Sequence, residues 1–195
     1  ELLQQSRIVS DIPPEFSKIE VNGLSSDSRY AQRGDLFFAK KGAASHGLDF
    51  LASLLEKGVC AIIYEDPDNT IIAPEGITSL RVDNIDGLMR ELTFKFYADL
   101  QSRIELIGVT GTEGKTSVTQ FITKAFSMLN IDCGLIGTNG IGFMGNLKEN
   151  THTTPDLMAL YQSLAEIDAH DDVRVLMSGM LPIALEVTSH ALDQK

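Results

Sequence analysis

The chain has 195 residues, 43% of them hydrophobic and 22% charged, with a formal net charge of −11. These values are typical of a globular protein with one large domain or two small ones. The acidic balance argues against a nucleic-acid partner, because the chain has no basic stripe to neutralise a phosphate backbone. No apolar run approaches the roughly 20 residues of a membrane span, and no signal-peptide pattern opens the chain. We therefore expect a cytoplasmic protein without membrane insertion.

The first hundred residues alternate short apolar strands with helices. A polar, turn-forming cluster at 24–29 precedes a predicted strand at 36–39. A helix is expected from about residue 49 to Gly58, because apolar residues share one face there and glycine stops it. The remaining elements expected in this part are strands at 59–64 and 79–82 and a helix at 85–97. This alternation predicts a small α/β unit that ends within 98–103.

Residues 104–117 are the feature around which the second half is organised. A strand rich in Ile, Leu and Val runs into the loop Gly111-Thr112-Glu113-Gly114, which continues as Lys115, Thr116, Ser117 and a helix. The backbone N–H groups of such a loop and the dipole of the following helix can hold a phosphate. Lys115 would reach the β- and γ-phosphates, and the Thr116 hydroxyl would coordinate Mg²⁺. The loop is shorter than the strict Walker pattern, so its strand–loop–helix setting carries the prediction.

The elements after this loop are less sharply defined. The helix at 118–129 is expected to bury an apolar face at helical spacing, formed by Phe121, Ile122, Ala125, Phe126 and Leu129. A strand at 133–136, a glycine-rich hairpin at 137–150 and a helix that begins near Asp156 should follow. Residues 173–177 and 181–187 are both predicted strands. Because it contains Pro182, the strand at 181–187 should either begin near this proline or lie at a sheet edge.

Four blocks of this sequence resemble the Mur ligase family, in the order and at about the spacing found there. They are Asp27-Ser28-Arg29 with Gly34-Asp35-Leu36-Phe37, then residues 111–117, then Thr153-Thr154-Pro155-Asp156, and finally residues 186–194. Mur ligases are ATP-dependent enzymes that form amide bonds in peptidoglycan precursor synthesis. The resemblance implies an α/β protein with a small N-terminal UDP-sugar-binding domain at 1–102. It also implies the first part of a P-loop ATPase domain, truncated, at 103–195.

The resemblance also implies a role for each block. The expected contacts are Ser28 with the UDP end of the substrate; Gly111, Thr112, Glu113, Gly114, Lys115, Thr116 and Ser117 with ATP; Thr153 and Thr154 with the substrate's diphosphate; Ser189 and Gln194 with its muramoyl-peptide; and Thr116 with Glu186 for Mg²⁺. Lys115 and Glu186 would be the catalytic pair.

The implied reaction adds the third amino acid to UDP-N-acetylmuramoyl-L-alanyl-D-glutamate through an acyl phosphate. The implied partners are therefore the UDP-muramoyl-peptide and an amino acid, and we expect a monomer. The amino-acid-binding domain of the family has no counterpart in these 195 residues. We therefore expect them to lack ligase activity by themselves.

Several alternatives remain open at this stage. Glu113 places a carboxylate beside the expected triphosphate, where like charges repel, so a non-catalytic nucleotide-binding or interaction module is the main rival. A folate polyglutamate synthetase is disfavoured, because those relatives lack the N-terminal unit with Asp-Ser-Arg. Each expected contact also has a purely structural interpretation. Ser28 would then be a turn former, Thr153 and Thr154 helix caps, and Glu186 a surface charge at a strand end.

Overall fold

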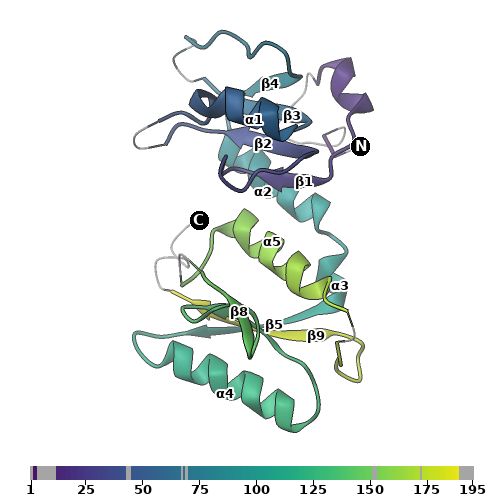
Figure 1. Cartoon of the computed structure of the whole chain (residues 1–195), viewed down its shortest axis with the longest axis vertical. Coiled ribbons are helices and arrows are strands. Elements are labelled where there is room, and N and C mark those ends of the chain that lie inside the picture. The colour runs from purple at the N-terminus through teal and green to yellow at the C-terminus, as the bar shows by residue number, and fades with distance from the viewer. Residues whose placement is uncertain are drawn as a thin grey trace. The chain divides into compact units, whose positions relative to one another are not determined.

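The computed structural model describes residues 2–3, 12–42, 45–66, 68, 70–150, 153–171 and 173–188. The chain separates into two compact units, Glu1–Phe96 and Tyr97–Lys195 (Figure 1). Each unit contains one β-sheet with helices packed against it. The α/β class expected from the sequence is thereby confirmed.

The first unit is built on a four-stranded parallel sheet with the order β1-β2-β3-β4. Its strands are β1 (Gly23–Ser25), β2 (Asp35–Ala39), β3 (Ala61–Glu65) and β4 (Ser79–Val82). Strand β2 is buried along its whole length, and so are the first four residues of β3. Continuous burial of this kind is typical of parallel strands covered on both faces. Burial on both faces explains why residues 36–39 and 61–64 are continuous apolar runs in the sequence.

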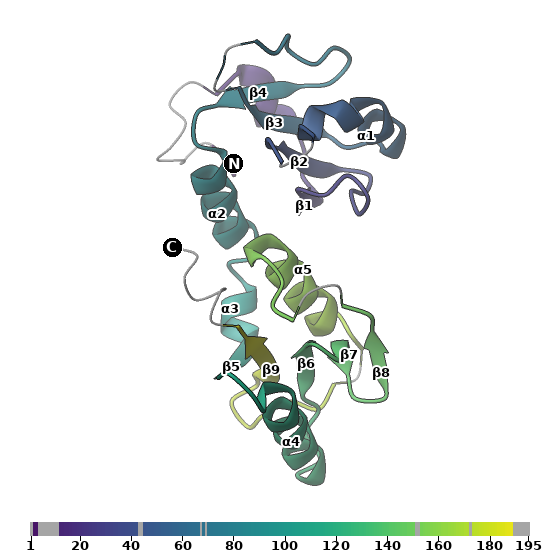
Figure 2. The same cartoon turned by 90° about the vertical axis from the view of Figure 1, so that its left-hand side faces the viewer.

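The helices of the first unit cover the two faces of this sheet. Helix α1 (Leu51–Lys57), preceded by the 3₁₀ turn η2 (Gly47–Phe50), packs Leu54 against a cluster that includes Phe37 and Ile62. Helix α2 (Ile85–Phe96) lies on the opposite face (Figures 1 and 2). A further 3₁₀ turn, η1 (Pro14–Lys18), precedes β1. Each fully buried Leu, Ile or Phe of this core contributes about 1.5–3 kcal/mol through removal from water.

The second unit has a five-stranded mixed sheet with the order β5-β9-β6-β7-β8. Its strands are β5 (Ile104–Thr110), β6 (Gly134–Gly137), β7 (Gly140–Phe143), β8 (Asn146–Lys148) and β9 (Leu181–Val187). The last strand in sequence, β9, lies between β5 and β6 and is parallel to both. The carboxyl ends of these three strands therefore meet at one edge of the sheet, where open α/β sheets place their ligands.

Two longer helices pack on opposite faces of this sheet, α4 (Lys115–Met128) on one and α5 (Leu157–Asp168) on the other (Figure 1). Ile122 and Phe126 of α4 pack against Leu135 and Ala184. Helix α5 packs on a larger cluster of strand residues. The short helix α3 (Leu100–Arg103) leads directly into β5. Among the described residues, no helix is both long enough and apolar enough to cross a membrane.

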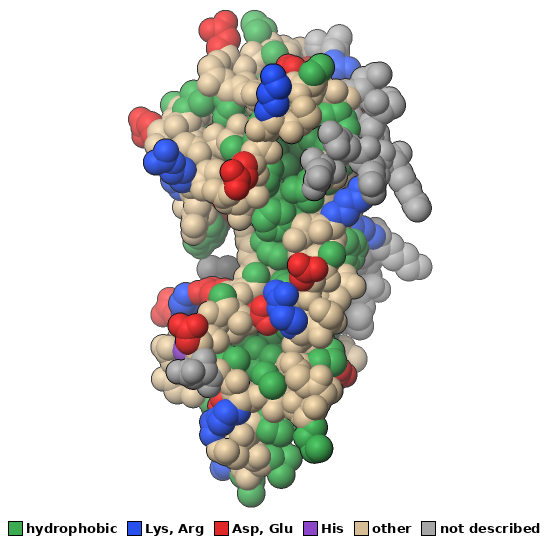
Figure 3. All heavy atoms as spheres, turned by 90° about the vertical axis from the view of Figure 1, so that its right-hand side faces the viewer, with side chains coloured by type: hydrophobic (Ala, Val, Ile, Leu, Met, Phe, Trp, Pro, Cys, Tyr) green, Lys and Arg blue, Asp and Glu red, His purple; other side chains and the backbone are tan. Residues whose placement is uncertain are grey.

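The structure bears on three sequence-based expectations for the second unit, which concern α4, residues 173–177 and Pro182. On α4, Phe121 and Leu129 are 69% exposed instead of buried, while Thr119 and Thr123 face the sheet. Within the described residues the sheet ends at β5. Hydrophobic side chains are visible on the surface at the end of the unit that α4 forms (Figure 3). Residues 173–177 form no strand, because a turn that joins Leu176 to Met180 occupies this stretch.

Pro182 lies near the start of β9, although β9 is an interior strand. It pairs with Glu105 of β5, whereas pairing with β6 begins only at Ile183. The proline therefore occupies a part of β9 that has a neighbour on one side only. This agrees with the expected restriction of Pro182 to a strand start.

Candidate functional site

The strand–loop–helix element expected from the sequence is present at residues 104–128. Strand β5 ends at Thr110, the loop follows, and α4 begins at Lys115. Gly111 has a φ of 151° and Gly114 a φ of 79°, a backbone conformation that favours glycine. All four residues from Gly111 to Gly114 are exposed, including Glu113. The loop is thus open to a ligand, and water can screen the Glu113 carboxylate.

Lys115 is folded back over this loop. Its Nζ donates hydrogen bonds to the carbonyl oxygens of Gly111, at 2.7 Å, and Thr112, at 3.3 Å. These carbonyls hold the ammonium group directly above the loop, next to the helix N-terminus. Lys115 therefore lies where the positive ends of the loop amides and of α4 would also attract an anion.

Glu186 is the most deeply buried ionisable group at this edge of the sheet. It lies near the end of the interior strand β9 and is 0% exposed. Its Oε2 accepts hydrogen bonds from Thr116 Oγ1, at 3.1 Å, and from Thr138 Oγ1, at 3.0 Å. Thr119 Oγ1 is 3.4 Å from the other carboxylate oxygen. Glu186 is therefore an interior carboxylate surrounded by hydroxyl groups, and its interpretation as a surface charge is wrong.

The pair formed by Thr116 and Glu186 suits a magnesium ion. A hydroxyl and a carboxylate supply the hard oxygen ligands that Mg²⁺ prefers, and this ion commonly uses only one or two protein ligands beside phosphate and water. Nowhere in the described part of the chain do three His, Cys, Asp or Glu side chains gather in a way that could hold a metal. Cys60 and Cys133 are both free thiols.

Thr153 and Thr154 join the same constellation. Thr154 Oγ1 donates to the carbonyl oxygen of Glu186 at 2.8 Å and accepts from the backbone N–H of Thr188 at 3.0 Å. Thr153 Oγ1 lies 3.1 Å from Thr138 Oγ1. Neither threonine caps α5, because Asp156 is the N-cap residue, and its side chain accepts from the Ala159 N–H. The segment before α5 is thus hydrogen-bonded to the end of β9.

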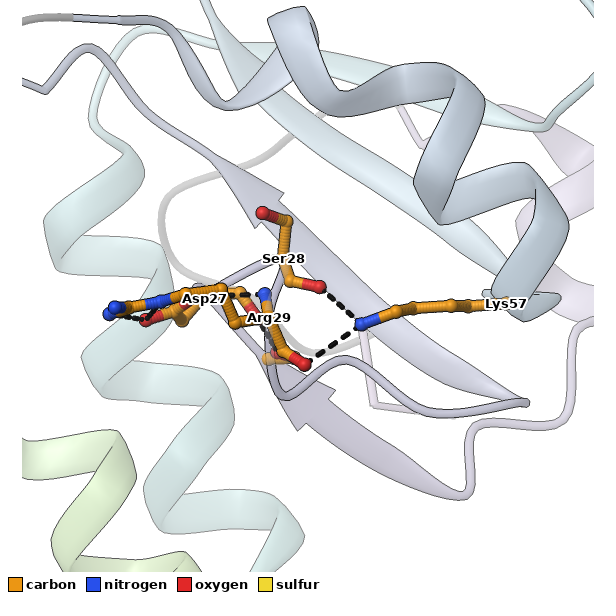
Figure 4. A network of polar contacts seen from close by, with 5 residues as sticks. Asp27, Ser28, Arg29 and Lys57 are labelled. Carbon is orange, nitrogen blue, oxygen red and sulfur yellow. Dashed lines mark hydrogen bonds and ion pairs between the residues drawn. The ribbon is translucent and has the colours of Figure 1, made fainter.

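Ser28 belongs to the first unit, in a turn that follows β1. The Asp27 side chain accepts from the Arg29 backbone N–H at 2.9 Å and forms an ion pair with the Arg29 guanidinium at 2.6 Å. These hydrogen bonds lower the pKa of the Asp27 carboxyl. Lys57 at the end of α1 donates to the carbonyl oxygens of Ser28, at 2.6 Å, and Arg29, at 2.8 Å. The Ser28 hydroxyl points away from Lys57 (Figure 4).

The expected residues therefore divide into three groups. Residues 111–117, Glu186, Thr153 and Thr154 come together at one edge of the second unit. Ser28 lies in the first unit, and Ser189 and Gln194 lie outside the described residues. Thr138 and Lys57 escaped the sequence analysis. Thr138 had a usable signal, because it is a polar residue two positions after the predicted strand at 133–136.

Comparison with known protein families gives two matches that together cover most of the chain. Residues 20–97 match the Mur ligase family, catalytic domain, and residues 109–195 match the Mur ligase middle domain. The first match ends one residue past the first compact unit, and the second lies within Tyr97–Lys195. Both descriptions name Mur ligases, and the two matched segments follow one another along the chain.

Two curated relatives similar to this chain carry the same name. The UDP-N-acetylmuramoyl-L-alanyl-D-glutamate–2,6-diaminopimelate ligase of Coxiella burnetii is 38% identical over 175 residues, which are 90% of this chain and 34% of that ligase. The ligase of the same name from Pseudomonas putida is 36% identical over 174 residues, 89% of this chain and 34% of that ligase. The chain thus spans about a third of the length of the curated relatives it matches.

Solved structures show the same architecture. A structure of a UDP-N-acetylmuramoyl-L-alanyl-D-glutamate–2,6-diaminopimelate ligase has a TM-score of 0.64 at 25% identity and covers 95% of this chain and 35% of that one. MurF ligase from Thermotoga maritima, solved in complex with ADP, has a TM-score of 0.53 at 19% identity over 88% of this chain and 33% of its own. This second likeness concerns the fold alone.

Proposed function

The chain belongs to the Mur ligase family, and from this premise we propose that it serves an ATP-dependent ligase of peptidoglycan precursor synthesis. The reaction would join a third amino acid to UDP-N-acetylmuramoyl-L-alanyl-D-glutamate by an amide bond. The names of the similar ligases make 2,6-diaminopimelate the first amino acid to test. The observation that carries the proposal is the hydrogen bond between Thr116 and the buried Glu186 beside an open glycine loop.

In this proposal the second unit binds ATP. The N–H groups of residues 111–117 would surround the phosphates, and Lys115 would leave the loop carbonyls to contact the β- and γ-phosphates. Thr116 and Glu186 would hold Mg²⁺, which when bound neutralises part of the triphosphate charge. Burial of Glu186 favours this role, because a carboxylate in the interior of a strand gains more from a bound cation than an exposed one.

The first unit would bind the UDP end of the substrate at Ser28. Thr153 and Thr154 would contact its diphosphate, and Ser189 with Gln194 its muramoyl-peptide. Thr154 already holds the segment before α5 against β9, so the hydroxyl of its neighbour Thr153 is placed at the edge where Glu186 lies. These assignments extend the family resemblance residue by residue, onto 1–102 as UDP-sugar domain and 103–195 as the first part of the ATPase domain.

The chemistry follows from the charges that must be brought together. The terminal carboxylate of the substrate attacks the γ-phosphorus of ATP to form an acyl phosphate and release ADP. The amine of the incoming amino acid then displaces phosphate from the acyl carbon. Two anions approach in the first step, so the contribution of Lys115 and of the loop amides is to position the phosphates and to stabilise the negative charge.

Calorimetry with two ligands tests the proposal. ATP with Mg²⁺ should bind the chain, and UDP should bind it independently. The variants Lys115→Met and Glu186→Gln should lose binding of ATP with Mg²⁺ and retain that of UDP. Binding of UDP without ATP would instead favour the rival, a non-catalytic module in which Glu113 repels the triphosphate.

A further inference from the structure

Thr138 contacts two of the proposed functional residues at once. It lies in the two-residue turn between β6 and β7, where Gly137 pairs with Gly140. Its Oγ1 is 3.0 Å from Oε2 of Glu186 and 3.1 Å from Oγ1 of Thr153. One hydroxyl group thus connects the interior strand β9 to the segment that precedes α5.

The direction of these hydrogen bonds follows from counting protons. A threonine hydroxyl carries one proton and two lone pairs, and an ionised carboxylate can only accept. Thr138 therefore donates its proton to Glu186 and accepts a proton from Thr153. The bond to the carboxylate is charge-assisted and is the stronger of the two. This arrangement orients both the Glu186 carboxylate and the Thr153 hydroxyl.

The other hydroxyls near Glu186 are less suited to fix it. Thr116 donates to the same oxygen, but in the proposed function its own oxygen turns to the cation that Glu186 also ligates. Thr119 lies farther away, at 3.4 Å, and is also within hydrogen-bonding distance of the carbonyl oxygens of Lys115 and Thr116. Thr138 belongs to neither the loop nor α4, so its hydrogen bond to Glu186 does not depend on the positions of these two elements.

The turn that carries Thr138 is held tightly by its surroundings. Asn150 Nδ2 donates to the carbonyl oxygen of Gly137 at 3.2 Å. Gly140 has a φ of 130°, and a Cβ there would meet the backbone of Lys148. Antiparallel pairing with β8 therefore fixes the path of the chain directly after Thr138. A side chain on so constrained a turn can act as a fixed reference point for its neighbours.

We propose that Thr138 is a positioning residue, which holds Glu186 in the orientation that binds Mg²⁺ with ATP and aligns Thr153 beside it. This role rests on the proposed function of the second unit. The side chain need not touch ATP or the cation, because it acts through Glu186. Removal of its hydroxyl should therefore weaken binding of ATP with Mg²⁺ while the loop itself stays intact.

Calorimetry on four forms of the chain tests this role: wild type, Thr138→Val, Thr138→Ser and Thr123→Val. Valine removes the hydroxyl at nearly constant shape, whereas serine keeps it. Thr123 is the matched control, because it is buried on α4 and its hydroxyl donates only to the Gln120 carbonyl among the contacts described. We expect Thr138→Val to bind ATP with Mg²⁺ about 10-fold more weakly than wild type, as for loss of a hydrogen bond to a charged group. Thr138→Ser and Thr123→Val should stay within about twofold.

A double-mutant cycle without any ligand separates this role from the proposed function. Denaturant unfolding is compared for wild type, Thr138→Val, Glu186→Met and the double variant; methionine removes both acceptor oxygens with little change of volume. The two substitutions should be coupled by roughly fivefold or more in the unfolding equilibrium constant.

Each outcome has a definite meaning. Coupling together with the expected loss of affinity in Thr138→Val, rescued in Thr138→Ser, supports the role. Zero coupling, or wild-type affinity in Thr138→Val, overturns it and leaves the proposed function standing. A wild-type chain that binds no ATP with Mg²⁺ overturns the proposed function and, with it, the role of Thr138, even where the cycle still shows that the two side chains interact.

Discussion

Gly137 is the position where one added methyl group should damage the site most directly. A Cβ at this residue of β6 would lie 2.5 Å from Cδ and 2.6 Å from Cγ of Glu186 on the neighbouring strand β9. The backbone of Gly137 has no positive φ, so alanine introduces no conformational strain of its own. The variant Gly137→Ala therefore tests the steric contact with the carboxylate alone.

The expected magnitude follows from this geometry. Overpacking of a close-packed interior costs about 1–3 kcal/mol. Glu186 can escape only by breaking its hydrogen bonds to Thr116 and Thr138, each worth about 1.5–3 kcal/mol for a charged acceptor. Replacement of glycine returns about 0.4–1 kcal/mol through the unfolded chain. From the loss of both hydrogen bonds, less the return from the unfolded chain, we expect Gly137→Ala to lower the free energy of unfolding by about 2–6 kcal/mol and to weaken binding of ATP with Mg²⁺ at least about 10-fold.

Urea unfolding and calorimetry measure both effects, and two other glycines serve as controls. A Cβ at Gly108 of β5 would meet only Val187, at an ordinary 3.6 Å, so Gly108→Ala should leave affinity unchanged and raise the free energy of unfolding by at most about 0.4–1 kcal/mol, through the unfolded chain. A Cβ at Gly134 of β6 would lie 2.9 Å from Ile167, away from Glu186. Gly134→Ala should thus lower stability and leave affinity unchanged in the folded protein. Wild-type affinity in folded Gly137→Ala would refute the reasoning.

Three further predictions concern other parts of the chain. Lys57→Met should weaken UDP binding severalfold in calorimetry, because the Ser28 turn loses both hydrogen bonds from Nζ; the exposed Lys18→Met is the control, and equal affinities would count against the proposed site. Burial raises the pKa of Asp35, so its contribution to stability falls as pH rises through that raised pKa. Asp35→Asn should consequently be more stable than wild type in urea at pH 7 and no more stable at pH 3, and an equal gain at both values would exclude this cause. Burial raises the pKa of the Cys133 thiol to about 11, so iodoacetamide at pH 8 should label it, as read by mass spectrometry, only as fast as the protein unfolds; rapid labelling of folded protein would contradict this.

Local patterns were sufficient to predict most elements. The apolar run at 59–64, the short strand at 79–82 and the helix at 85–97 are present within a few residues of the expected bounds. Such elements are determined by neighbours in sequence, whose periodicity reports which side is buried. Strand order is different, because the insertion of β9 between β5 and β6 depends on contacts between distant segments.

The error on α4 has a related cause. Helical spacing correctly indicates that one face of this helix is apolar, but it cannot say what covers that face. Phe121 and Leu129 are exposed, whereas Thr119 and Thr123 are buried with their hydroxyls within hydrogen-bonding distance of helix carbonyls. A hydroxyl satisfied in this way is compatible with burial. Hydrophobicity alone therefore predicted the buried face only in part, because Ile122 and Phe126 pack on the core while Phe121 and Leu129 do not.

The sequence was sufficient to predict the charged residues of the candidate site, but not the side chains that hold them in place. Glu186 follows an apolar run, which is visible in the sequence, and the structure shows that this run is a parallel strand with Glu186 near its carboxyl end. Its contact with Thr138 joins two strands that are far apart along the chain. No spacing rule relates such a pair, so the sequence marks Thr138 only as a polar residue beyond a strand, and the folded structure is needed to show that it contacts Glu186.

The interior position of β9 has a consequence for how the second unit comes into being. Strand β5 has no partner in the described structure other than β9, and this pairing runs from Ile104 with Leu181. The parallel pairing of β6 with β9 also requires residues from Ile183 onward. Closing so long a loop carries a large entropic cost and slows folding. On the ribosome the strands of the first unit can pair in their order of synthesis, whereas Thr116, directly after the glycine loop, meets Glu186 only after residue 187 has emerged. The hydrogen bond between Thr116 and Glu186 is therefore among the last contacts of this unit to form.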